Sequence, residues 1–169
     1  MRYGRAMVLA GLGLAGCANL AELNGFAVGP LGPRASRCEV AIAGAATPRD
    51  AFKDTREARM TIGGSGWCGW AVRLVDQNDI QYPWDRALVA RAPAHGEVRV
   101  VQDGQVAHIE YRPAPGYRGA DSFAVELAPG LAPRRASVEV VAPTPGPVAP
   151  ETVITSTRHI TPPGHWWWY

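Results

Sequence analysis

Residues 93–127 decide the fold class, and they read PAHGEVRVVQDGQVAHIEYRPAPGYRGADSFAVEL. On both sides of Asp103-Gly104, apolar and polar side chains alternate with a period of two, the pattern of a half-buried strand. Asp-Gly between two such runs is typical of the tight turn in a β-hairpin. The pattern therefore predicts a hairpin followed by a further strand. The side chains predicted to face the core are Val98, Val100, Ala107, Ile109, Tyr111, Phe123, Val125 and Leu127.

The same alternation extends in both directions, over residues 36–142. Residues 58–62 and 68–74 form two more such runs on either side of a glycine-rich turn, and Val138 and Val140 form the last one. Short strands at this spacing are typical of two-sheet sandwiches, and about 105 residues suffice for one hydrophobic core. We therefore expect an all-β domain over residues 36–142, an antiparallel β-sandwich of about seven or eight short strands.

Three motifs stand out within the opening stretch. They are Pro93-Ala94-His95-Gly96-Glu97-Val98, then Asp103-Gly104, then Tyr111-Arg112-Pro113-Ala114-Pro115-Gly116-Tyr117-Arg118-Gly119-Ala120-Asp121-Ser122-Phe123. Together they resemble the bacterial Ig-like, cadherin-like tandem-repeat family, which implies an Ig-like sandwich. The resemblance covers about a third of the mature chain, with one copy present, and residues 36–92 depart from the family pattern.

Three residues of these motifs have expected structural roles. Tyr111 and Tyr117 are expected to pack their rings and place their hydroxyls at polar rims. Asp121 is expected to accept backbone N–H bonds in the turn before its strand.

The first sixteen residues have the order of a secretory signal, with Arg2 and Arg5, an apolar run over residues 6–14, and small residues after it. The apolar run is too short for a membrane-spanning helix, which needs roughly 20 residues. Leu14-Ala15-Gly16-Cys17 resembles the lipobox of bacterial lipoproteins. The resemblance implies cleavage before Cys17 and a diacylglycerol on its thiol. Because Ala18 follows rather than Asp, it also implies anchoring in a Gram-negative outer membrane, on its periplasmic or surface face. An ordinary secretion signal with a chance cysteine is the alternative.

Processing would change the charge balance. The full chain has 17 basic and 15 acidic residues, and removal of Arg2 and Arg5 with the signal would equalise the two numbers. A near-neutral mature protein lacks the basic footprint that nucleic-acid binding requires. We therefore expect no nucleic-acid partner.

Cys38 and Cys68 are the cysteines that remain after Cys17. In an oxidising compartment they are expected to form a disulfide, with both side chains pointing inward by strand parity. Two buried free thiols are the alternative. Their spacing suits neither a redox pair nor a zinc site.

The chain ends are predicted to lie outside the domain. Residues 17–35 contain Asn-Gly and Gly-Pro pairs and are expected to form a flexible stalk. Residues 143–169 form a proline-rich tail in which residues 152–157 suit a short β segment.

The tail closes with four aromatic residues in a row: Trp166, Trp167, Trp168 and Tyr169. Exposed, they would suit docking to a partner protein or a membrane interface. A glycan-binding surface is a second reading, with Trp67 and Trp84 as possible additions. A terminus that folds back on the domain or has no role is a third.

The sequence offers no catalytic, metal or cofactor pattern that outweighs a structural explanation. Ser65 fails the nucleophile-elbow motif because Trp67 replaces its second glycine, and it is read as a turn residue. The run 76–79 could suggest calcium, but an Asx turn explains it better. His108 has outward parity. The predicted function is therefore a lipid-anchored, non-enzymatic envelope protein with an Ig-like interaction or assembly module; the alternative is a carbohydrate-binding module for peptidoglycan or another glycan.

Overall fold

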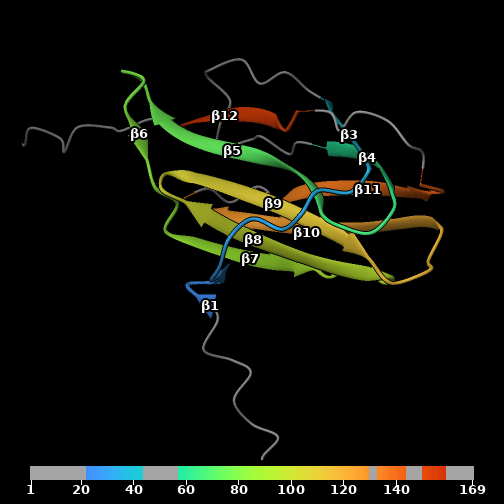
Figure 1. Ribbon diagram of the computed structural model, residues 1–169. Helices are drawn as coiled ribbons and strands as arrows, with labels where there is room; N and C mark the ends of the chain where they lie inside the picture. Colours follow the sequence, from blue (N-terminus) through green and yellow to red (C-terminus); the bar gives the residue numbers. More distant parts are fainter. Residues whose placement is uncertain (1–21, 44–56, 130–132, 144–149, 159–169) are drawn as a thin grey trace, which may run out of the picture.

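A computed structural model describes residues 22–43, 57–129, 133–143 and 150–158. This part of the chain contains twelve strands and no helix, arranged as two mixed β-sheets (Figure 1). The all-β prediction is confirmed. No helix among the described residues has the length and apolar character needed to cross a membrane.

The first sheet has the order β1-β2-β8-β9-β5-β12, with β6 also paired to β5. Its strands are β1 (Glu22–Leu23), β2 (Phe26–Ala27), β5 (Cys68–Asp76), β6 (Gln81–Tyr82), β8 (Gly96–Asp103), β9 (Val106–Pro113) and β12 (Thr152–Arg158). The second sheet has the order β3-β4-β11-β10-β7. Its strands are β3 (Arg37–Ala43), β4 (Glu57–Gly63), β7 (Arg86–Arg91), β10 (Gly119–Ala128) and β11 (Arg134–Val141).

The strand pairing corrects the expectation of a purely antiparallel fold. Three pairs are parallel: β11 with β4, β12 with β5, and β2 with β8. Each parallel pair joins strands far apart in the sequence, because a parallel partner needs a long crossover connection. The number of strands among the described residues also exceeds the expected seven or eight. The additional strands are three of only two residues each, β1, β2 and β6, and β12 in the tail.

The core lies between the two sheets. The Phe123 ring of the second sheet stacks on Trp70 and Tyr111 of the first, with ring centroids 6.0 and 5.7 Å apart. All the side chains predicted to face inward from residues 93–127 belong to this core or pack against it. The hairpin is also confirmed, because Asp103 pairs with Val106 and Gly104 adopts a φ of 58°.

Residues 22–35, within the range expected to be a stalk, lie on the domain instead. Asn24 and Gly25 have φ values of 57° and 78°, the left-handed conformation of a tight hairpin turn, and they connect β1 to β2. Phe26 and Ala35 are buried in the core. The Asn24-Gly25 pair, which the sequence pattern assigned to a flexible stalk, is therefore a hairpin turn. Burial of the Phe26 and Ala35 side chains holds this segment against the domain.

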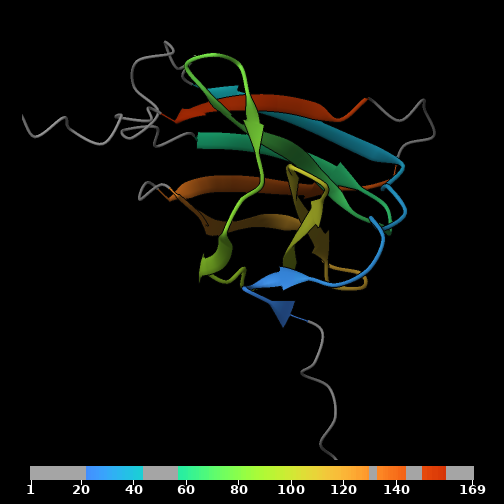
Figure 2. The same cartoon turned by 90° about the vertical axis from the view of Figure 1, so that its left-hand side faces the viewer.

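The two chain ends of the described domain lie at opposite edges. In Figures 1 and 2, β1 lies at the bottom of the molecule and β12 at the top. The predicted β segment in the tail is confirmed as β12, which adds a parallel edge strand beside β5. Cys17 and Trp166 to Tyr169 lie outside the described residues.

Candidate functional site

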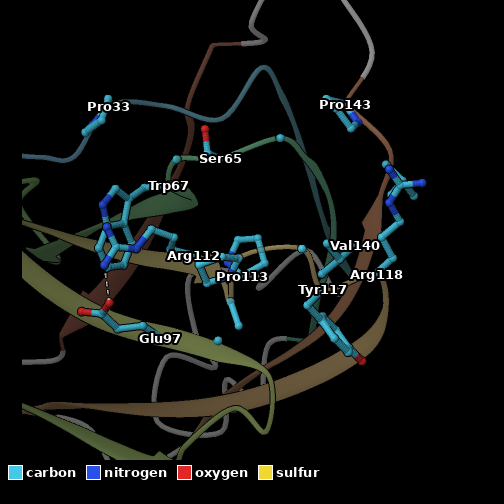
Figure 3. A pocket seen from close by; sticks show the side chains of 17 residues that line it. Pro33, Ser65, Trp67, Glu97, Arg112, Pro113, Tyr117, Arg118, Val140 and Pro143 are labelled. Carbon is cyan, nitrogen blue, oxygen red and sulfur yellow. Dashed lines mark hydrogen bonds and ion pairs between the residues drawn. The ribbon is translucent and has the colours of Figure 1, made fainter.

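A groove of about 890 Å³ opens at one end of the two sheets. It lies between the glycine-rich turn before β5, the start of β8, the loop after β9 and the end of β11 (Figure 3). Its walls are mostly proline, glycine and Trp67, and its polar side chains include Glu97, Arg112 and Arg118. A pocket of this size accommodates a small ligand or a short extended segment of a partner.

Glycines shape the upper wall of the groove. Gly66 has a φ of 124°, a conformation that side chains rarely adopt. A Cβ there would lie 2.8 Å from both Ala35 N and Pro33 O. The close approach lets Ala35 N donate to Trp67 O, and Trp67 N to Pro33 O, each over 2.9 Å. The turn is thus tied to the segment before β3. Ser65 lies in this turn, as the sequence predicted, and its side chain is exposed.

Trp67 forms the inner wall and is almost completely buried. The guanidinium groups of Arg99 and Arg112 lie 4.1 and 4.6 Å from its ring centre. Each arginine is also held by a carboxylate, Arg99 by Glu110 and Arg112 by Glu97. The edge of the ring faces Gly32, where a Cβ would collide with Cδ1.

This arrangement corrects the suggestion that Trp67 and Trp84 stack on sugars. Arginine side chains occupy the space over the Trp67 ring. Trp84 is buried, donates its indole N–H to Val72 O over 3.1 Å, and lies under Arg134. Both rings are therefore structural, and a sugar-binding role would depend on Trp166 to Trp168, outside the described residues.

The sequence contained a signal for the ion pairs that support Trp67. The Asp103-Gly104 turn sets the hairpin register, and this register places Glu97 opposite Arg112 and Arg99 opposite Glu110. Opposite charges at facing positions stabilise a strand pair. The pairs could thus be predicted from the hairpin, whereas the position of Trp67 beside them could not.

Asp121 organises the loops next to the groove. Its carboxylate accepts hydrogen bonds from the N–H groups of Ala94, His95 and Ser122 over 2.8–2.9 Å, and from the Tyr111 hydroxyl over 3.1 Å. Burial alone would raise the pKa of this carboxyl, but the donated hydrogen bonds outweigh it and hold the pKa below its ordinary value. Asp121 accepts backbone N–H bonds as predicted, but it lies within β10, and two of the donors belong to the turn before β8 rather than to the turn before its own strand.

The two tyrosines of the motif have the predicted roles. Burial and then the negative charge of Asp121 raise the pKa of Tyr111 well above its ordinary value. The Tyr117 ring stacks on His95 with centroids 4.2 Å apart, and its hydroxyl donates to Ala120 O over 2.7 Å. His95 is thus a packing residue at this rim.

His108 has the outward parity that the sequence predicted, and of the two roles expected for it, solvated or structural, the structure shows the structural one. It faces outward on β9 but is buried, and its Nδ1 lies 3.0 Å from Oε2 of Glu151, just before β12. The hydrogen bond to Glu151 raises the pKa of His108 and outweighs the opposing effect of burial, while Asp103 and Glu110 add to the increase.

This pair predicts a pH dependence of stability. Because the folded-state pKa of His108 is raised, its stabilisation is fully present below the unfolded-state value of about 6.5 and is lost as the pH rises through the folded-state value. Glu151→Gln should therefore lower the melting temperature more at about pH 5.5 than at about pH 8.5. Thermal unfolding by circular dichroism at both pH values measures this, with Glu39→Gln, in an exposed ion pair with Arg37, as the control. An equal loss at both pH values would contradict the prediction.

Two further sequence predictions are settled by local geometry. Cys38 and Cys68 form a disulfide and both are buried, as expected. The run after β5 is an Asx turn, because the Asp76 carboxylate accepts hydrogen bonds from Asn78 N and Ile80 N. Across the described ranges, His, Cys, Asp and Glu side chains form no group of three that could hold a metal ion.

No family model matches the chain, and a comparison with curated proteins finds no significant relative. The groove and its supporting ion pairs, together with the resemblance of the first seventeen residues to a lipoprotein signal, are therefore the basis for a functional proposal.

Proposed function

We propose that the chain is an exported lipoprotein, cleaved before Cys17 and anchored in the outer membrane through lipid on that residue. Its two sheets form an Ig-like β-sandwich that binds an envelope protein in the groove and catalyses no reaction. The observation that carries the binding role is the groove itself, a cavity of about 890 Å³ whose walls are held by structural contacts.

The Ig-like assignment is supported by the roles of the motif residues. Asp121 joins the turn before β8 to the start of β10, and Tyr111 stacks on Phe123 across the two sheets. The motif residues thus form the core and the loop connections at one end of the domain, which explains why they occur together.

Binding is favoured over catalysis by the partners of the charged groups. Glu97 is bonded to Arg112, and Glu110 to Arg99. Carboxylates used in these pairs hold Trp67 in place and are poor candidates for proton transfer. Rigid proline walls and a preformed shape reduce the ordering that binding requires.

The partner that fits this groove is an extended segment of a protein with an acidic side chain. The glycine-rich turn and the loop after β9 line the groove, and we expect an extended chain to lie along them as in other peptide-binding grooves. Arg118 is exposed at the rim and provides a positive charge that is not part of the Trp67 pairs.

The lipid anchor is tested by Cys17→Ser. This substitution removes the thiol that would carry the diacylglycerol, so we expect nearly all the protein to move from the membrane fraction to the soluble fraction. Cell fractionation and immunoblotting measure the change. Cys68→Ser, which removes a buried disulfide partner, serves as the control and should leave the remaining protein on the membrane. A Cys17→Ser protein that still fractionates with the outer membrane would overturn the lipoprotein proposal.

The groove is tested by photo-crosslinking in intact envelopes. A benzoyl-phenylalanine at Ser65 should capture a protein, and Arg118→Glu should reduce that product at least fivefold. The same probe at Gln105, exposed in the hairpin turn at the other end of β9, is the control and should not give the product. Equal capture at both positions would contradict a groove-specific partner.

The aromatic terminus is tested separately. Peptidoglycan pull-down with and without residues 165–169 measures glycan binding by the tail. Loss of retention on truncation would favour the carbohydrate-binding alternative, and equal retention would remove the tail from that role.

A further inference from the structure

We propose that the edge strand β7, together with the adjoining β1–β2 turn, faces the lipid bilayer and places Leu88 and Val89 at its headgroup interface. This inference rests on the proposed lipid anchor at Cys17. It adds an orientation to that anchor and assigns a lipid-contacting surface to the domain.

The first step is where the chain enters the domain. Ala87 N donates to Asn24 O over 3.0 Å, so the turn between β1 and β2 lies directly on β7. A Cβ at Gly25 would collide with the Ala87 carbonyl, which shows how closely the two backbones approach. Phe26, one residue later, is buried in the core. The entry point is thus fixed beside Ala87, the neighbour of Leu88.

The second step is the length of chain between the anchor and this entry point. Cys17 precedes Glu22 by five residues, which span at most about 17 Å when fully extended. A domain of this size has a radius of gyration of roughly 13 Å, and so a width well above the reach of that connection. A lipid on Cys17 therefore keeps the β1 side near the bilayer. β12 lies at the opposite edge of the domain (Figures 1 and 2). The connection is too short for the domain to rotate until β12 contacts the bilayer.

The third step is the chemistry of the surface beside the entry point. Leu88 and Val89 are 50% and 37% exposed, so this strand presents two neighbouring large apolar side chains to solvent. Arg86 and Arg91, at the two ends of β7, are also exposed. Apolar side chains flanked by arginines suit a headgroup interface, where the apolar groups enter the acyl boundary and the guanidinium groups bind phosphates.

The same orientation leaves the groove accessible. β2 pairs with β8 at Val101, whereas the groove is lined by Gly96 at the other end of β8. The bilayer contact and the proposed protein site therefore occupy different ends of this strand, and both can be filled at once.

The experiment places a benzoyl-phenylalanine at Leu88 of the full-length, membrane-bound protein. After irradiation in isolated membranes, mass spectrometry measures phospholipid adducts on the peptide that contains the probe. The matched control carries the probe at Val153 on β12, which is 48% exposed and lies at the far edge. We expect at least fivefold more lipid adduct at position 88 than at position 153. Val28, exposed just after β2, is a second test position and should also give adducts.

The outcomes separate this inference from the lipoprotein proposal. The same spectra report the mass of the N-terminal peptide. A Cys17 peptide without lipid would overturn the anchor and this orientation with it. A lipidated Cys17 with equal adducts at positions 88 and 153, or with more at 153, would overturn the orientation alone and leave the anchor standing.

Discussion

Replacing both Cys38 and Cys68 with alanine is expected to lower the free energy of unfolding by about 3–4 kcal/mol. The disulfide joins β3 of the second sheet to β5 of the first, across a sequence separation of 30 residues. Without it the unfolded chain gains the conformational freedom of that loop, whereas most folded contacts remain. Urea unfolding at equilibrium, followed by tryptophan fluorescence, measures the loss.

The position of the disulfide adds to the expected effect. β3 is the edge strand of its sheet and pairs with β4 alone among the described strands. The Cys38–Cys68 bond is its covalent link to the first sheet. Reduction of the wild-type protein should give the same loss as the double substitution. A change below about 1 kcal/mol would show that the strand is held by packing and that the unfolded-state argument does not apply here.

Asp121→Ala is expected to cost about 3 kcal/mol of stability, because it leaves several donors without their acceptor. The donors are three backbone N–H groups and the hydroxyl of Tyr111. Chemical denaturation measures the loss. Tyr111→Phe is the matched control, since it removes one of these hydrogen bonds and keeps the ring stacked on Phe123. It should cost about 1 kcal/mol.

The same carboxylate predicts a pH dependence of the opposite sign to that of His108. The pKa of Asp121 is lowered in the folded state, so its stabilisation is present above the unfolded-state value of about 3.9 and is lost as the pH falls through the folded-state value. Asp121→Ala should therefore flatten the fall in stability below about pH 4. A variant that loses stability with acid as steeply as the wild type would contradict this assignment.

Local patterns predicted much of the fold but little of the site. The alternation around Asp103-Gly104 predicted a hairpin and its buried face, and both are present. Parity also placed His108 on the outer face correctly, but not its burial. Glu151 is 43 residues away in the sequence and reaches His108 only because β12 pairs with β5. Parity states which face a side chain points to, whereas what covers that face depends on distant strands.

The sequence by itself determined most of the longer strands, their inward faces and the cysteine pair, since these depend on a period-two backbone, on turn residues such as Gly104, and on two thiols with one available partner each. The N-terminal segment was misjudged because the Asn24-Gly25 turn lies among residues with little periodicity. Tertiary structure alone decided that β4 lies beside β11, that β5 lies beside β12, and that Trp67 lies between two arginine–carboxylate pairs. The physical reason is that alternation is a property of one strand. Which strands pair depends on which arrangement buries the apolar faces of the whole chain together. That arrangement must also offset the entropy lost when the long loops between distant strands are closed.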